Sequence, residues 1–147
     1  MNSVSLTAFG LKIANNTAQN GVGGLFMDGG LLDLSSTTIA TNSGAQLFLM
    51  NSMSVSIRNS IVWGSGNGDA VASNLQSQLP GSIHHSIVDW GGFATQGYLR
   101  ADPLFVDAAA GNHNVQSGSP AEDGGDPAST DEDGSRSDMG AHQIVGN

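Results

Sequence analysis

Segments of the chain resemble one another at regular distances, and this limits the possible folds more than any other feature. Residues 55–63 read VSIRNSIVW, residues 82–90 read SIHHSIVDW, and residues 32–39, LDLSSTTI, follow the pattern more loosely. Four isoleucines align in this comparison at nearly equal intervals: Ile13, Ile39, Ile61 and Ile87. A period of about 20–50 residues indicates a fold built from stacked, similar units.

Within each period the residues are typical of short β-strands. Apolar runs of three to six residues alternate with turns such as 28–30 (DGG) and 64–68 (GSGNG), and such runs are too short for helices. The triplet LFM at 25–27 recurs as LFL at 47–49. The sequence therefore predicts an all-β protein in which about four coils stack as a parallel β-helix, with equivalent strands about 4.8 Å apart.

Asparagines support the stacking. Asn16 and Asn42 each lie three residues after an aligned isoleucine. Asparagine tolerates the left-handed turn conformation and can hydrogen-bond to its equivalent in the next coil. We therefore expect these two side chains to be bonded to each other.

The pattern divides the chain into two parts of a single domain. Residues 1–93 are predicted to form the coils, with an excursion loop over 64–81 in which a short helix is one option. Residues 94–147 are rich in Pro, Gly and Asp. Because a bare end of a stack exposes apolar core and unpaired backbone, we expect this segment to cap the coils.

Composition excludes several classes of protein. The chain has 13 acidic and 4 basic residues and a net charge of −9, which argues against nucleic acid and anionic membranes as partners. No apolar run approaches the roughly 20 residues that cross a bilayer, and the N-terminus carries no signal-peptide character. With no cysteine, disulfides, thiolate nucleophiles and zinc–sulfur sites are excluded.

Five motifs follow one another in the second half of the chain: NSIVW (59–63), SIVD (86–89), DPLFVD (102–107), GSPAEDGGD (118–126) and DEDGSRSDMGA (131–141). In this order they resemble the C-terminal part of bacterial secreted right-handed parallel β-helix proteins, described as choice-of-anchor Q or polymorphic-outer-membrane-protein-like. The resemblance covers most of the chain. It implies a right-handed β-helix, an extracellular or cell-surface setting, and no established catalytic residues.

Aromatic residues concentrate in one region, which makes them candidates for carbohydrate binding because exposed rings stack against sugar faces. Trp63 and Trp90 close equivalent segments, one position apart, and are expected on one side of the stack. The proposed ligand-binding residues are Trp63, Trp90, Phe93 and Tyr98. The alternative is that these rings form a hydrophobic lid under the 64–81 excursion.

Acidic residues concentrate in the C-terminal segment. Asp131, Asp133 and Asp138 are candidate calcium ligands, although their spacing is not that of an EF-hand. The alternative is structural: Arg136 forms an ion pair with Asp138, Asp131 or Asp126 that fixes the cap to the last coil. Apart from this candidate calcium, no cofactor is expected.

Catalysis has weak support in the sequence. His84 and His85 are adjacent in a predicted strand and would point to opposite faces, so they do not readily ligate one ion. Asp28 and Asp33 straddle a turn, but two nearby carboxylates are too generic to indicate a glycosidase. We therefore expect a non-catalytic surface or secreted module for adhesion or carbohydrate contact. The alternatives are a fragment of a polysaccharide lyase or glycosidase-like enzyme, and a purely structural segment.

The N-terminal end of the predicted stack has nothing before it to cover it. Residues 3–30 form the first coil, and an exposed strand edge is a template for pairing with another chain. The sequence therefore predicts a homodimer through this end.

Overall fold

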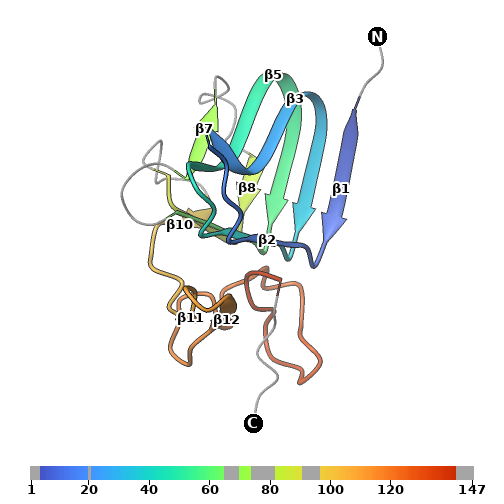
Figure 1. Cartoon of the computed structure of the whole chain (residues 1–147). Helices are drawn as coiled ribbons and strands as arrows, with labels where there is room; N and C mark the ends of the chain where they lie inside the picture. Colours follow the sequence, from blue (N-terminus) through green and yellow to red (C-terminus); the bar gives the residue numbers. More distant parts are fainter. Residues whose placement is uncertain (1–3, 20, 65–69, 74–81, 91–96, 142–147) are drawn as a thin grey trace.

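The structure is a computed structural model of the chain (Figure 1) and describes residues 4–19, 21–64, 70–73, 82–90 and 97–141. Within these residues the regular secondary structure is β-strand, with no α-helix. This confirms the prediction of an all-β protein. A helix suited to crossing a membrane is likewise absent from the described part of the chain.

Two parallel sheets make up most of the molecule. Sheet A has the order β1-β3-β5-β7, with β8 also pairing with β5: β1 (Ser5–Phe9), β3 (Val22–Ser35), β5 (Ala45–Arg58), β7 (Val71–Ser73) and β8 (Ile83–His84). Sheet B has the order β10-β9-β6-β4-β2: β2 (Lys12–Ala14), β4 (Thr38–Ala40), β6 (Ile61–Trp63), β9 (Ser86–Val88) and β10 (Tyr98–Leu99). An antiparallel pair, β11 (Phe105–Asp107) and β12 (Asn112–Val115), lies in the C-terminal segment. The long strands β3 and β5 bend, so that sheet A curls (Figure 1).

Most neighbouring strands pair in parallel at nearly constant intervals along the sequence. In sheet B, Ile13 pairs with Ile39, and Ile61 pairs with Ile87, so that the same interval separates the partners of both pairs. Between them, Ile39 pairs with Val62 at a slightly shorter interval. Sheet A has the same series of intervals, because Leu6 pairs with Leu32, Leu34 pairs with Ile57, and Ile57 pairs with Ile83. Each pass of the chain therefore lays its strands beside those of the preceding pass.

One sequence alignment is wrong by a single residue. The isoleucine spacing made Ile39 and Ile61 equivalent, whereas Ile39 pairs with Val62. The reason lies upstream, where the pairing of β3 with β5 shifts register between Asp28 and Gly30. Such an irregularity adds one residue to one strand of a pair and bends it. The interval between partners is therefore longer by one position after this point than before it.

The core lies inside the curl of sheet A and against one face of sheet B. Side chains alternate along β1 and the second half of β3, so that Leu6 and Ala8 pack inward while Phe9 is 79% exposed. The core consists mainly of aliphatic side chains with no exposed surface, including Leu32, Leu34, Ile39, Leu47, Leu49, Ile57, Val62, Ile83 and Val88. Burial of these side chains is the main source of stability.

Strands β6 and β9 of sheet B are apolar on both faces. Val62 and Val88 belong to the main core, whereas their neighbours Ile61 and Ile87 pack in a second cluster with Met139 of the C-terminal segment. Adjacent residues of a strand point to opposite faces, so each Ile-Val pair places one side chain in each cluster. Sheet B therefore needs a cover on its outer face as well as its inner one.

The C-terminal segment provides this cover. It lies against the outer face of sheet B (Figure 1), whereas the sequence predicted a cap over the end of the stack. Asp126 donates its N–H to Oδ1 of Asn59 at 2.8 Å, and Gly140 donates its N–H to the Asn59 carbonyl at 2.8 Å. Ala141 donates its N–H to Oγ1 of Thr38 at 2.9 Å. The segment is thus bonded to two successive passes of the chain.

Part of the predicted excursion belongs to sheet A. Val71 pairs with Leu47, and the strand β7 extends the sheet beside β5. Val71 is 2% exposed and belongs to the main core. Burial stabilises this position, because the apolar Val71 side chain extends the main core beside β5.

The asparagine pair forms as predicted. Asn16 donates from Nδ2 to Oδ1 of Asn42 at 2.9 Å. The left-handed turn conformation occurs one residue earlier, at Asn15 (φ 58°) and Thr41 (φ 56°). Both positions of each turn bond to the neighbouring pass, because Thr41 also donates from Oγ1 to Oδ1 of Asn15.

Two adjacent leucines test the inward and outward faces of β3. Leu32 has no exposed surface and Leu31 is 40% exposed. We expect Leu32→Ala to lower the free energy of unfolding by about 2–5 kcal/mol, because a cavity remains in the core. The matched control, Leu31→Ala, should cost less than about 1 kcal/mol. Urea unfolding followed by circular dichroism measures both, and a larger cost for Leu31→Ala would show that the strand is turned over.

Candidate functional site

A pocket of about 410 Å³ lies where sheet B meets the C-terminal segment. Trp63, the last residue of β6, forms one side, and Phe105 of β11 belongs to the opposite element. Both rings are half-buried and pack against the second cluster. The full lining is Thr41, Trp63, Gly64, Asp102, Leu104, Phe105, Ala108 and Gln116.

Polar side chains at this pocket are held in place by hydrogen bonds to neighbouring groups. Asp102 accepts a bond at Oδ1 from the Leu104 N–H at 2.9 Å, which fixes the carboxylate at the start of the turn into β11. Gln116 donates from Nε2 to the Phe105 carbonyl at 2.9 Å. Thr41 Oγ1 lies 2.8 Å from Nε2 of His113, a ring that is 2% exposed. The pocket thus combines two aromatic rings with a carboxylate, an amide and a hydroxyl.

The other predicted aromatic residues lie elsewhere. Trp90 is 2% exposed and Tyr98 is 7% exposed, and their rings stack in the main core with centroids 6.2 Å apart. Trp63 instead packs with the second cluster, because one position along a strand reverses the face. Phe93 lies outside the described residues. Trp63 is thus the member of the predicted set that lines this pocket.

Each of the predicted calcium ligands accepts a backbone hydrogen bond within the C-terminal segment. Asp131 accepts at Oδ2 from the Asp138 N–H at 3.0 Å, and Asp133 accepts at Oδ1 from the Ser135 N–H at 2.9 Å. Asp138 accepts at Oδ1 from the Asp123 N–H at 2.7 Å. Nowhere in the described ranges are three Asp, Glu or His side chains grouped so that they could hold a metal ion.

Two of these carboxyl groups have shifted pKa values. Burial, with repulsion from Asp138 and Asp133, raises the pKa of Asp131 above its ordinary value of 3.8. Hydrogen bonds from the backbone and side chain of Ser135 lower the pKa of Asp133. The folded state therefore holds a proton on Asp131 more tightly than the unfolded chain does. The contribution of Asp131 to stability is fully present at low pH and is lost as the pH rises through its folded pKa.

Arg136 binds backbone carbonyls. Its Nε donates to the Gly125 carbonyl at 2.7 Å, and its Nη2 donates to that same carbonyl and to the Gly124 carbonyl. Asp126, one predicted partner, instead accepts at Oδ1 from the Ala128 N–H at 2.9 Å. Ion pairs in the described residues join Arg58 to Asp33 at 3.5 Å and Arg100 to Asp89 at 3.2 Å.

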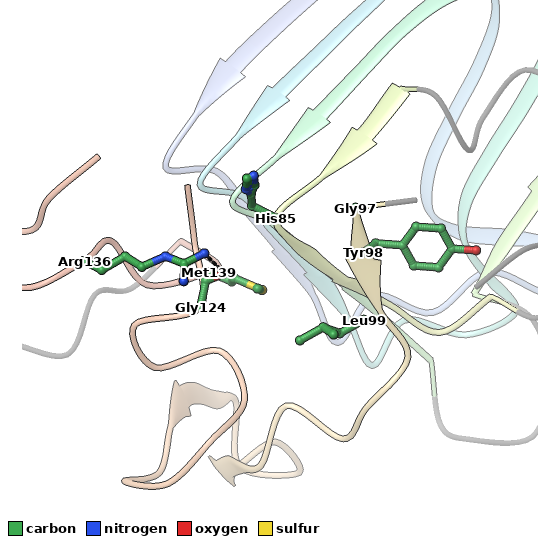
Figure 2. A pocket seen from close by; sticks show the side chains of 7 residues that line it. All are labelled: His85, Gly97, Tyr98, Leu99, Gly124, Arg136 and Met139. Carbon is green, nitrogen blue, oxygen red and sulfur yellow. Dashed lines mark hydrogen bonds between the residues drawn. The ribbon is translucent and has the colours of Figure 1, made fainter. Parts of the chain in front are cut away.

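A second pocket, of about 390 Å³, lies beside Arg136. Figure 2 shows His85 on one side of it, Arg136 and Met139 on another, and Leu99 below. Gly97, Tyr98 and Gly124 complete the lining. The Tyr98 ring points away from this pocket toward the core (Figure 2). The pocket lies between the corner after β8 and the C-terminal segment.

Sequence reasoning missed most of the Trp63 pocket. Asp102, Phe105 and Gln116 lie far along the chain from Trp63 and reach it only because the C-terminal segment folds back on sheet B. The available signal was the motif DPLFVD at 102–107, which interrupts an otherwise polar segment with apolar residues.

Comparison with family models, curated proteins and solved structures finds no match to this chain.

Proposed function

We propose that this chain is a non-catalytic carbohydrate-contacting module of a secreted or cell-surface protein. The observation that carries the proposal is the half-buried Trp63 ring, which shares a pocket with Phe105, Asp102 and Gln116. Aromatic rings offer flat apolar faces that suit the C–H faces of sugar rings. A carboxylate and an amide at the same pocket suit sugar hydroxyls, which both donate and accept hydrogen bonds.

The architecture that we propose is a right-handed parallel β-helix. The supporting observation is that both sheets repeat the same series of pairing intervals, as expected when one chain winds repeatedly past the same two sheets. Handedness follows from a general rule, because crossovers between parallel strands of one sheet are right-handed in nearly all proteins. The resemblance to bacterial secreted β-helix proteins supports the extracellular setting.

The single carboxylate among the described lining residues of the pocket favours binding over hydrolysis. Glycoside hydrolysis generally uses two carboxyl groups about 5–9.5 Å apart across the bond that breaks. Among the described lining residues Asp102 is the one carboxylate, and its Oδ1 is engaged by the Leu104 N–H. Such a carboxylate can accept a hydrogen bond from a sugar hydroxyl without acting on the glycosidic bond.

We expect the chain to bind a subset of glycans on an array, and Trp63→Ala to weaken the binding at least tenfold, because the stacking surface is lost. The matched control is Phe26→Ala, which removes a 53% exposed ring from sheet A, outside this pocket. Calorimetry with the best glycan measures the affinities. Equal binding by Trp63→Ala and the wild type would contradict the proposal. Release of sugar products that stops in Asp102→Asn would favour the enzyme alternative.

A homodimer is the second candidate, and one observation favours it. The edge strands β1 and β2 lie at the same end of the two sheets, and no described strand pairs with their outer edges. Val4 is 59% exposed beside this end, and Leu6 and Ile13 at the margin of the core are only partly buried. Open backbone next to apolar surface favours pairing with a second chain.

A proline in β1 tests the dimer. The Val4 carbonyl and the Gly10 N–H bond to β3, so alternation along the strand directs the Thr7 N–H to the open edge. Thr7→Pro should therefore leave β1 in the sheet but remove an edge donor. Sedimentation velocity should give a dimer for the wild type and for the control Thr7→Ala, and a monomer for Thr7→Pro. A wild-type monomer at high concentration would rule the dimer out.

A further inference from the structure

The pocket beside Arg136 places two nitrogen-bearing side chains against an apolar wall. His85 comes from the corner between β8 and β9, and Arg136 comes from the C-terminal segment (Figure 2). Leu99 and Met139 line the same space of about 390 Å³. This volume is ample for a small organic molecule.

His85 has a polar atom without a partner in this pocket wall. Its Nδ1 is buried and has no hydrogen-bond partner in the part of the chain that the structure describes. The backbone of His85 has a φ of 47°, and Asn59, at the same corner of the preceding pass, has a φ of 46°. The corner thus fixes the point at which the side chain leaves the backbone. A buried ring nitrogen without a partner costs free energy, and a bond to a ligand relieves that cost once the ring turns toward the pocket.

Arg136 carries a positive charge that the described residues do not neutralise. Its bonds from Nε and Nη2 go to uncharged carbonyls, and no described carboxylate lies within ion-pair distance of it. The remaining nitrogen, Nη1, has no acceptor in the described chain. The carbonyl bonds hold the guanidinium in place, so that its free side is available to an anion.

We propose that this pocket binds the carboxylate of a small organic acid. The carboxylate accepts hydrogen bonds from Arg136 and from the His85 ring, and the apolar part of the acid packs on Leu99 and Met139. With a net charge of −9 the chain as a whole repels anions, so a monoanion is favoured over a dianion such as phosphate. The proposal does not depend on sugar binding at Trp63.

Nuclear magnetic resonance of the full chain tests the proposal with butyrate, acetate, glucuronate and inorganic phosphate as probes. Butyrate should produce saturable shifts of the Met139 methyl and His85 ring signals, with a dissociation constant of about 1 mM for so small a ligand. Acetate should bind more weakly because it lacks the apolar part. Glucuronate distinguishes a sugar acid from an aliphatic acid as the source of the carboxylate. Absence of saturation by all three carboxylates, or binding of phosphate alone, would overturn the proposal.

Variants separate binding from folding. His85→Asn should weaken butyrate binding at least fivefold while the fold is retained, because asparagine tolerates the left-handed conformation and already occupies this corner at Asn59. Leu99→Ala, at a side chain that is 45% exposed, should reduce the preference for butyrate over acetate. Arg136→Gln should abolish binding, and Arg58→Gln, which removes a cation from sheet A, should not change it. Unchanged butyrate affinity in both His85→Asn and Arg136→Gln would contradict the site.

Discussion

Parallel pairing in register between successive passes of the chain is the constraint on which the structure depends. It places like side chains above one another, so that Leu34 pairs with Ile57, and Ile57 pairs with Ile83, all three with no exposed surface. The backbone N–H and C=O groups of each pass form hydrogen bonds with the next pass, and the apolar side chains of each pass contribute to the main core. A shift of one residue would turn these side chains outward along a whole strand.

The corners between the two parallel sheets and the outer face of sheet B contribute residues to the two pockets. Ser36 and Asn59 have φ values of 46° and His85 has 47°, so the chain turns in the same way at these three equivalent corners. Asn59 accepts a hydrogen bond from the C-terminal segment, and this segment covers Ile61 and Ile87 on the outer face of sheet B. Both pockets lie along the line where this cover meets the sheet. Their residues therefore come from distant parts of the sequence.

The sequence predicted the pairing of identical motifs but not the irregular places. The equivalence of Ile61 and Ile87 was identified correctly, because both stand in the same motif, SIV, at 60–62 and 86–88. At the end of β1 the large Phe9 side chain is exposed and the small Ala8 side chain packs inward, because the face that a strand residue occupies depends on its position and not on its size. The Trp63 pocket could not be predicted, because it forms only where the C-terminal segment packs on sheet B, and no local sequence pattern specifies that position.

Distances between labels on adjacent strands test the parallel register most directly, and the absence of native cysteine makes labelling specific. Thr7 pairs with Asp33, and Phe9 pairs with Ser35. Spin labels on cysteines at Thr7 and Asp33 should show strong dipolar broadening, as expected for strands about 4.8 Å apart. Moving both labels two residues forward, to Phe9 and Ser35, should preserve that broadening. If the broadening disappeared in the second pair, the strands would not be parallel in this register, and the account would be contradicted.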